Sequence, residues 1–411
     1  MFKIGIVGAG AIGGCHKEAF KENPSCELVA VCDKVLDRAI KLAEGTAAHV
    51  YEEYQEMCEC EKLDAVILNL PHFLHESVTV YFLEKGISVL IEKPMAINTA
   101  ECDAMIAASK KTGAKLAVGH VQRYYNCYRI LKEMIAEERF GKLCGIREVR
   151  NCDYFTGRPG WFLNRKLAGG GILMNYGAYT LDKIFYTTGL KVENVVAMGN
   201  NFLTDDTVEA IAQLLVQFEG GVNGTFCYCG CKVPSEYRTD FYFTNGAAQI
   251  RDGWELWISE EGGEFVRVDG CNSWGLFEVQ LAEFVKLLKG EESEVVTPEY
   301  GKEVIAVLEK ADVFLSHCGM NSVSESLYFG VPLIMLPQTA EQSGVSERVN
   351  QLGAGIKLDR PDVSSILEAI NEIFLNSSYK QNAASISKSF KCCSGAKGAA
   401  DKILKVCEKS V

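Results

Sequence analysis

A glycine-rich turn near the start of the chain constrains the fold more than any other feature. Gly8, Gly10 and Gly13 form a G-x-G-x-x-G pattern directly after the apolar run FKIGIV and before a predicted helix. Asp33 follows 20 residues after Gly13, at the end of the second predicted strand. Glycines at these places permit a tight turn and let a pyrophosphate approach the backbone, while the helix N-terminus offers free N–H groups. The pattern predicts a dinucleotide-binding turn.

Short apolar runs and helical patterns alternate through the first third of the chain. The predicted strands cover residues 2–10, 27–34, 63–71, 88–94 and 114–120. This βαβ series predicts a doubly wound, parallel Rossmann sheet over residues 1–121. Longer alternating runs between about 193 and 260 predict an α+β substrate and oligomerisation domain over 122–311, with an open antiparallel sheet and two closing helices. Residues 312–411 form a third part.

Composition limits the partners and the compartment. The 411 residues are 23% charged and 48% hydrophobic, which predicts a soluble globular protein of two or three domains. A net charge of −12 argues against nucleic acid and against a membrane as partners. No stretch of ~20 apolar residues and no leader is visible. The 17 cysteines, without a small disulfide-stapled format, favour a reducing cytoplasm.

Cysteines do not predict a metal site in this chain. Cys227, Cys229 and Cys231 alternate along one predicted strand and therefore share one face. Structural metal sites usually combine a C-x-x-C pair with a second pair elsewhere, and no such second pair is recognisable. We therefore expect buried or inert thiols and no metal.

Two further strand ends carry candidate site residues. Glu92, Lys93 and Pro94 follow a buried strand whose carboxyl end would face the ligand, and a proline there suits a tight turn, in some proteins through a cis bond. Lys93 would meet the nicotinamide end of the cofactor. His120 ends the fifth predicted strand and is either a rival base or a hydrogen-bonded structural histidine. Asp33 would accept hydrogen bonds from ribose and repel a 2′-phosphate, which favours NAD while leaving NADP open.

Four motifs in the expected order resemble one enzyme family. The glycine turn, the stretch LNLPHFLHE with Asn69, Pro71 and His75, the EKP motif and the stretch GGGILMNYGAYTLD at 169–182 are similar to the Gfo/Idh/MocA (glucose–fructose oxidoreductase/inositol dehydrogenase) family over residues 1–311. The resemblance implies hydride transfer between a nicotinamide cofactor and a secondary alcohol of a sugar, cyclitol or glycoside. It also implies a homo-oligomer, either a dimer or a tetramer.

The resemblance assigns roles to particular residues. Most members carry D-x-G-x-H in the last motif, whereas this chain has Asn175 and Tyr179 at those places, followed by Asp182. Lys93 and Tyr179 are the expected catalytic pair, with the Lys93 ammonium lowering the pKa of the phenol from its usual ~10. The expected cofactor residues are Gly8, Gly10, Ala11, Ile12, Gly13, Asp33, Arg38, Asn69, Pro71, His75, Glu92 and Lys93. The expected substrate residues are Lys93, His120, Trp161, Asn175, Tyr179 and Asp182.

Two alternatives to net oxidation stay open on the sequence. The same fold also supports redox-neutral enzymes that oxidise, eliminate and re-reduce, and so cleave or epimerise a glycoside. The family further includes a non-catalytic dinucleotide-binding sensor. Arg123, Arg165 and Lys166 would pair with an acidic substrate group or with cofactor phosphates, or else lie on the surface as solvated charges.

The last part of the chain resembles a different family. The stretch 317–342, HCGMNSVSESLYFGVPLIMLPQTAEQ, is similar to the donor-binding signature of UDP-glycosyltransferases of the macrolide type. There, His317, Gly319, Asn321 and Ser322 match diphosphate ligands, Glu325 the ribose ligand, and Glu341 with Gln342 the sugar ligands. No acceptor domain precedes it, and residues 312–411 supply only two predicted strands, whose edges would lie open. We therefore expect a fragment of a second enzyme, a relic that is not a second working site.

Overall fold

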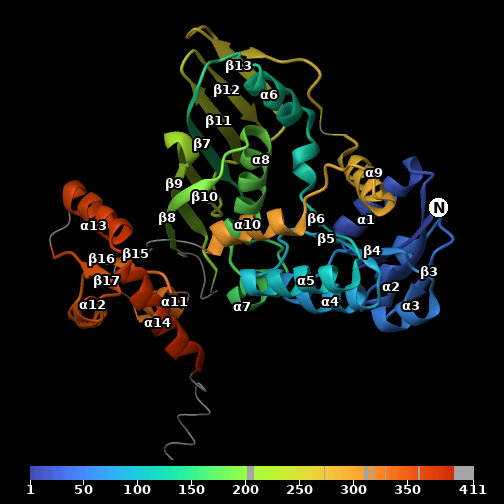
Figure 1. Cartoon of the computed structure of the whole chain (residues 1–411), viewed down its shortest axis with the longest axis horizontal. Coiled ribbons are helices and arrows are strands. Elements are labelled where there is room, and N and C mark those ends of the chain that lie inside the picture. Colours follow the sequence, from blue (N-terminus) through green and yellow to red (C-terminus); the bar gives the residue numbers. More distant parts are fainter. Residues whose placement is uncertain are drawn as a thin grey trace, which may run out of the picture. The chain divides into compact units, whose positions relative to one another are not determined.

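The computed structural model describes residues 1–200, 208–272, 274–309, 314–316, 318, 320–328, 330–359 and 362–392. The chain divides into two compact units (Figure 1). The main unit comprises Met1–Glu193 and Gly199–Glu309, and the C-terminal unit comprises Asn194–Met198 and Lys310–Val411.

The main unit begins with the predicted parallel sheet. Its strands run in the order β3-β2-β1-β4-β5-β6, and every neighbouring pair is parallel. Strands β4, β5 and β6 are buried along their whole length, as expected where helices cover both faces of a sheet. The strands are β1 (Phe2–Val7), β2 (Cys26–Cys32), β3 (His49–Tyr51), β4 (Ala65–Leu68), β5 (Ser88–Glu92) and β6 (Leu116–Gly119). The Rossmann prediction is confirmed.

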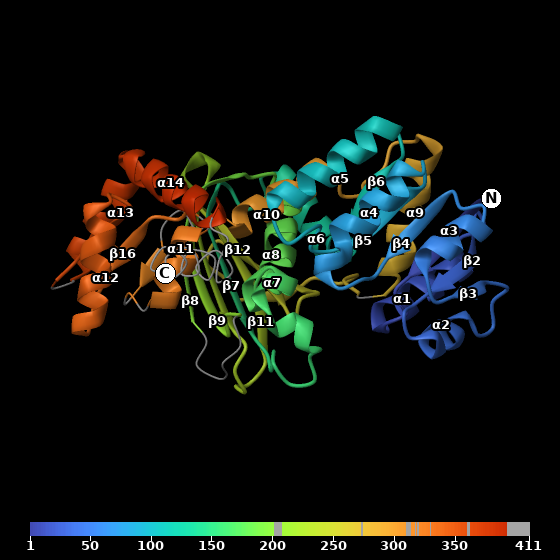
Figure 2. The same cartoon turned by 90° about the horizontal axis from the view of Figure 1, so that it is seen from below.

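Two apolar cores hold helices on the two faces of this sheet (Figures 1 and 2). One core joins the sheet to α1 (Ala11–Ala19), η1 (Phe20–Glu22), α2 (Leu36–Ala43) and α9 (Leu276–Lys289). The other joins it to α3 (Tyr54–Cys60), η2 (His72–Leu74), α4 (His75–Glu84), α5 (Thr99–Thr112) and α10 (Pro298–Glu309). Helices α9 and α10 belong to the closing stretch predicted for the second domain, but they return to the cores of the first sheet.

The second sheet of the main unit is mixed and mostly antiparallel, in the order β14-β13-β12-β11-β7-β10-β9-β8. Its strands are β7 (Leu143–Asn151), β8 (Val192–Asn200), β9 (Ile211–Phe218), β10 (Asn223–Cys229), β11 (Glu236–Phe243), β12 (Gly246–Arg251), β13 (Glu255–Glu260) and β14 (Val266–Arg267). The central residues of β8, Asn194–Met198, belong to the C-terminal unit. Strand β7 lies inside the sheet, parallel to β10 and antiparallel to β11. The prediction of an antiparallel sheet therefore missed a parallel central pair.

Short helical elements precede the second sheet or lie between its strands. They are η3 (Val121–Tyr124), α6 (Asn126–Ala136), η4 (Gly160–Leu163), α7 (Arg165–Ala168), η5 (Leu173–Gly177), α8 (Ala178–Thr188) and η6 (Glu219–Gly221). Helix α8 packs against α6 and bonds to the sheet, since Thr180 accepts a hydrogen bond from Tyr228 of β10 at 2.8 Å and donates one to Glu148 of β7. These contacts fix the start of α8 over the centre of the second sheet.

The C-terminal unit is a small α/β fold with more strand pairing than the sequence predicted. Its strands β15 (Phe314–Ser316), β16 (Leu333–Met335) and β17 (Gly355–Lys357) are parallel, with β16 in the middle. Phe314 also pairs with Ala197 of β8. The expectation of two strands with open edges is thus wrong, because the short GIK segment and a stretch from the middle of the chain both add to the sheet. The helices are α11 (Met320–Tyr328), α12 (Ala340–Gln351), α13 (Val363–Leu375) and α14 (Ser378–Cys392).

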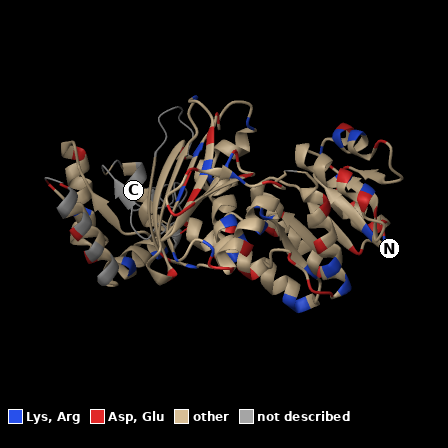
Figure 3. Ribbon diagram, turned by 90° about the horizontal axis from the view of Figure 1, so that it is seen from above, with Lys and Arg blue, Asp and Glu red and all other residues tan. Residues whose placement is uncertain are grey.

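Charge and hydropathy add two observations. Basic and acidic segments are interspersed along the main unit in Figure 3, without one continuous basic stretch in this view. Within the described ranges, no helix combines the length and the apolar character needed to cross a membrane.

Candidate functional site

The site candidates of the first sheet collect at one edge. Because β1, β2, β4, β5 and β6 are parallel, their carboxyl ends meet there. The residues that directly follow these five ends are Gly8, Asp33, Asn69, Lys93 and His120. The predicted cofactor residues and the EKP motif therefore share one edge.

The glycine turn has the geometry that a bound diphosphate needs. Gly8 has φ of 99°, and a Cβ there would lie 2.3 Å from the carbonyl oxygen of Asn69. A Cβ on Gly13 would lie 2.7 Å from the carbonyl oxygen of Gly8, so helix α1 packs close to β1. Gly10 caps α1 without a side-chain bond and has open space where a Cβ would stand. With exposed Ala11 and Ile12 beside it, the turn leaves its N–H groups accessible, as the phosphates of a dinucleotide require.

Three other predicted cofactor residues, Asp33, Arg38 and Asn69, lie at or after the strand ends near the glycine turn. The carboxylate of Asp33 accepts hydrogen bonds from the amides of Ala9 and Val35, both at 2.8 Å. Arg38 is exposed on α2. Asn69 donates from its amide to the carbonyl of Gly8 at 3.4 Å, while its buried side-chain oxygen has no hydrogen-bond donor among the described residues. A buried acceptor without a donor is costly unless a ligand supplies one.

The EKP motif forms a tight turn held from two sides. The Lys93–Pro94 peptide bond is cis. The carboxylate of Glu92 lies 2.9 Å from Nε2 of His16 on α1 and accepts a hydrogen bond from the Lys93 amide at 3.3 Å. The buried ring of His75 has one nitrogen 2.9 Å from the carbonyl of Pro94 and the other 2.9 Å from that of Leu70. Both His75 nitrogens thus face backbone oxygens, and the ring supports the turn that carries Lys93.

Lys93 contacts residues of the last family motif, the stretch 169–182. Residues 173–177 form one turn of π-helix, η5, which runs into α8. Such turns often occur at functional sites because they re-aim side chains. Asn175 in this turn accepts a hydrogen bond from Lys93 Nζ at 2.6 Å, and the ammonium also lies 4.1 Å from the ring centre of Tyr179. The structure therefore brings the predicted pair Lys93 and Tyr179 together with Asn175.

The charge state of this pair differs from the expectation. Burial, opposed by the Glu92 carboxylate and assisted by the guanidinium groups of Arg150 and Arg158, lowers the pKa of Lys93 to about 7. Burial and the Glu92 carboxylate raise the pKa of Tyr179. The expectation that Lys93 depresses the phenol pKa is wrong, because its ammonium lies over the ring face and desolvation dominates. Of the two groups, Lys93 is the one that titrates near neutral pH.

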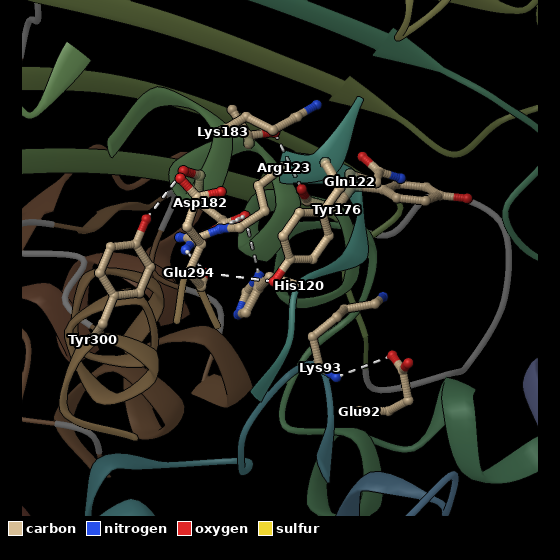
Figure 4. A network of polar contacts seen from close by, with 12 residues as sticks. Glu92, Lys93, His120, Gln122, Arg123, Tyr176, Asp182, Lys183, Glu294 and Tyr300 are labelled. Carbon is tan, nitrogen blue, oxygen red and sulfur yellow. Dashed lines mark hydrogen bonds and ion pairs between the residues drawn. The ribbon is translucent and has the colours of Figure 1, made fainter. Parts of the chain in front are cut away.

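A second polar cluster lies beside Lys93 (Figure 4). Asp182 is fully buried and accepts hydrogen bonds from Nε and Nη2 of Arg123, while Tyr300 donates to its backbone oxygen at 3.1 Å. Nδ1 of His120 lies 3.9 Å from Oδ2 of Asp182 and is buried without a hydrogen bond. Burial lowers the pKa of His120 to about 4, although Asp182 opposes this. Asp182 therefore already has its cationic partner, and His120 is neutral at ordinary pH.

Aromatic residues of η4 pack against η2. Trp161 lies edge-on to His72, with 4.9 Å between ring centres, and tilted against Phe162, with 4.1 Å between ring centres. His72 in turn lies 2.9 Å from the carbonyl of Ala168. Pro71 precedes this ring as the residue before η2. Trp161 thus packs beside the motif that contains Pro71 and His75.

Sequence reasoning missed Arg150 and Arg158. Arg150, near the end of β7, contacts two rings, with its guanidinium carbon 3.7 Å from the centre of Tyr176 and 4.2 Å from that of Tyr237. Arg158 donates to the Tyr176 hydroxyl at 3.1 Å. Neither arginine belongs to a recognisable motif, so its role depends on contacts between distant segments. Arg165, by contrast, pairs with Glu209 at 3.3 Å.

Most of the donor signature in the C-terminal unit lies where side chains are not described. His317 and Gly319 fall outside the described residues, and for Asn321, Ser322 and Glu325 only the backbone of α11 is described. Glu341 is exposed in the first turn of α12. Gln342 accepts hydrogen bonds from the amides of Gln338 and Thr339 and so belongs to the cap of this helix. Its carbonyl is thus engaged within the chain.

The fold and the site define a class, a two-domain oxidoreductase with a Rossmann nucleotide-binding part. Residues 2–120 match the model described as "Oxidoreductase family, NAD-binding Rossmann fold", and residues 128–249 match that of the GFO/IDH/MocA C-terminal domain. The chain belongs to the Gfo/Idh/MocA oxidoreductase family. Residues 307–392 match the model for UDP-glucuronosyl and UDP-glucosyl transferases.

Individual relatives agree with this assignment. Trans-1,2-dihydrobenzene-1,2-diol dehydrogenase of Mus musculus is 30% identical over 274 residues, which are 64% of this chain and 79% of that protein. D-glucoside 3-dehydrogenase of Escherichia coli is 33% identical over 193 residues, covering 46% of this chain and 54% of the relative. A solved levoglucosan dehydrogenase in complex with NADH and L-sorbose shares the fold with a TM-score of 0.69 at 16% identity, covering 75% of this chain and 95% of the other.

Proposed function

We propose that the chain is an NAD-dependent dehydrogenase that oxidises a secondary alcohol of a sugar, cyclitol or related diol. The observation that carries this proposal is the placement of Lys93 Nζ against Asn175 and Tyr179, at the sheet edge that also bears the glycine turn. The named activities of the relatives, on a diol and on a glucoside, support the substrate class.

The protonation states of Lys93 and Tyr179 would determine their roles in the reaction. Bound NAD would supply the acceptor for the hydride that leaves the alcohol carbon. Lys93, with its pKa lowered to about 7, would take the hydroxyl proton as a neutral amine. Tyr179 would keep its proton and would bond the substrate hydroxyl through its own hydroxyl. Asn175 holds the Lys93 nitrogen through its side-chain oxygen.

A panel of substrates tests this function. Sugars, cyclitols, glycosides and diols are incubated with NAD or NADP while absorbance at the band of the reduced cofactor is followed. We expect reduced cofactor to appear with at least one polyol. Product without reduced cofactor, from enzyme that retains its nucleotide, would instead indicate redox-neutral cleavage or epimerisation. Nucleotide binding without conversion of any compound would contradict an enzymatic role.

We also propose NAD as the preferred cofactor, because Asp33 follows β2 beside the glycine turn and would repel a 2′-phosphate. Replacing Asp33 with Ala should narrow the difference between NAD and NADP affinity by about tenfold, the equivalent of ~1.4 kcal/mol of charge repulsion. Titration calorimetry measures both constants. Asp37→Ala, an exposed change on α2, is the control and should leave the difference unchanged. Tighter binding of NADP to the unmodified chain would disprove the preference.

A further inference from the structure

Arg150 is a partly buried cation that lacks a counter-ion. In the part of the chain that the structure describes, its guanidinium has no hydrogen bond and no ion pair, and its Nη1 atom is buried without a partner. The other arginines near the site differ. Arg123 bonds Asp182, and Arg165 bonds Glu209. Burying an unsatisfied donor on a charged group raises the free energy of the protein. A hydrogen-bond acceptor on the substrate would remove this penalty.

Aromatic rings hold Arg150 in one orientation. Its guanidinium carbon lies 3.7 Å from the ring centre of Tyr176 and 4.2 Å from that of Tyr237. The Tyr237 hydroxyl is in turn bonded by buried Lys183, and Lys183 lies 3.9 Å from Glu148. Two rings thus contact the guanidinium, while its buried Nη1 donor has no hydrogen-bond partner among the described residues. A planar fork held in this way suits a carboxylate.

The position of Arg150 links it to the candidate catalytic pair. Its guanidinium carbon lies 3.7 Å from the ring centre of Tyr176, the residue next to Asn175 in η5, and Asn175 accepts a hydrogen bond from Lys93 Nζ at 2.6 Å. Arg158 bonds the hydroxyl of Tyr176, one of the two rings that contact Arg150. Arg150 and Arg158 are thus two cationic groups close to Lys93, whereas the carboxylate of Glu92 is engaged by His16. A local excess of positive charge at the reacting end favours an anionic substrate.

We propose that the substrate is a sugar or cyclitol that carries a carboxylate, with Arg150 binding that carboxylate and Arg158 reinforcing its field. This inference rests on the proposed dehydrogenase function, since it names the substrate class of the same site. The dinucleotide phosphates do not supply this anion, because the glycine turn provides their amides at the N-terminus of α1, whereas Arg150 lies on β7 with the residues around Lys93.

Matched pairs of neutral and acidic substrates test the proposal. Methyl glucoside is compared with methyl glucuronide, methyl galactoside with methyl galacturonide, and myo-inositol with quinate, each in the presence of NAD. We expect kcat/KM for the acid of at least one pair to exceed that of its neutral partner about tenfold or more, the usual worth of a hydrogen bond to a charged group. Glucose 6-phosphate is the arm for phosphate, and preference for it over the acids would overturn the carboxylate assignment.

Variants assign the effect to the arginine. Arg150→Met should reduce the ratio of acid to neutral kcat/KM by about 10- to 100-fold, and Arg150→Lys should recover only part of it because an ammonium lacks the fork. Arg147→Met is the matched control. It lies on the same strand at a position of opposite parity, 4.0 Å from Asp240, and should leave the ratio unchanged. An unchanged ratio in Arg150→Met would overturn the proposal.

Binding separates this inference from the proposed reaction. Calorimetry with glucuronate and with glucose, on the NAD-loaded chain, needs no turnover. Tighter binding of glucuronate that is lost in Arg150→Met would support the carboxylate site even if no compound were oxidised. Equal affinity for both ligands would overturn it even if neutral sugars were good substrates.

Discussion

Lys93 is the residue on which the proposed chemistry depends, and its environment sets a pH response. Its amine is buried, lies close to Asn175 and Tyr179, and is influenced by Glu92, Arg150 and Arg158. A neutral amine is needed to accept a proton, and an ammonium is needed to return one. Because the pKa of Lys93 is about 7, both forms are present at neutral pH. Oxidation and reduction should therefore depend on pH in opposite senses.

The pH profile of kcat/KM should report this titration. In the direction of alcohol oxidation, kcat/KM should rise through about pH 7 and level off above it, and in reduction it should fall over the same range. Glu92→Gln should move the midpoint to lower pH, because the carboxylate that raises the Lys93 pKa is removed. Lys93→Met should abolish the rise of kcat/KM near pH 7 together with most of the activity. A profile that is unchanged in Glu92→Gln would show that another group titrates.

Tyr179 should matter for rate and hardly for stability. Tyr179→Phe removes only the hydroxyl and keeps the ring that contacts Lys93, so folding should be nearly unaffected. Turnover should nevertheless fall by at least ~10²-fold, the usual effect of losing an acid–base or orienting group. Steady-state kinetics and NAD titration measure both effects. An active Tyr179→Phe, together with a folded but inactive His120→Ala, would make His120 the base.

The site shows what sequence can and cannot predict at the level of residues. The glycine turn and the EKP motif were predicted because each is a short local pattern that follows a strand. The contact of Lys93 with Asn175 agrees with the motif order, but the charge state of Tyr179 was wrong, since it depends on burial that no spacing reveals. Arg150 was missed for a related reason. Its two aromatic neighbours, Tyr176 and Tyr237, come from distant segments.

At the level of elements, buried polar contacts join the helices that frame the site. The Arg123–Asp182 pair connects η3 to α8, and Tyr300 connects α10 to the same carboxylate residue through its backbone. Strand β7 was not predicted because charged residues interrupt its apolar alternation, and Glu148, which is fully buried there, is satisfied by Thr180 and Thr239. In a sequence, a strand that contributes such buried polar residues resembles a loop, because its polar residues hide the apolar alternation.

Breaking the pair that joins η3 to α8 should destabilise the main unit strongly. Asp182→Asn preserves the shape but leaves the Arg123 guanidinium buried without a counter-ion, which should cost about 3–5 kcal/mol of unfolding free energy. Urea unfolding followed by fluorescence measures this. The control is Glu260→Gln, which breaks the exposed Arg139–Glu260 pair and should cost less than ~1 kcal/mol. Equal small losses in both variants would contradict the structural role of the pair.

At the level of the whole molecule, all the residues proposed for catalysis lie in the main unit, while the C-terminal unit carries the transferase-like segment. Domain boundaries at 121 and 311 and a dimeric or tetrameric assembly remain predictions. The sequence predicted the origin of residues 312–411 from a local signature, but not their strand pairing, because the GIK strand is too short to recognise and β8 is remote in the chain.

Removing residues 312–411 should leave catalysis largely intact. The truncated chain keeps α10 and every proposed catalytic residue, so kcat/KM should remain near that of the full chain, and the full chain should bind UDP-sugars more weakly than micromolar. The cut should lower solubility, because it uncovers the edge of β8 at Ala197, and Ala197→Lys in the truncated chain should restore it. Dehydrogenase loss in a folded truncate, or micromolar UDP-sugar binding, would show that the C-terminal unit is functional.

The pairing of Phe314 with Ala197 also has a consequence for the order of events during synthesis. The C-terminal unit takes one of its strands from the middle of the chain, more than a hundred residues before the rest of it. At a translation rate of ~5–20 residues per second, that strand leaves the ribosome roughly 6–25 seconds before its partner exists. The C-terminal unit can therefore be completed only after this earlier segment has been synthesised, and a chain whose synthesis ends between these points would leave the edge of β8 that pairs with β15 unpaired.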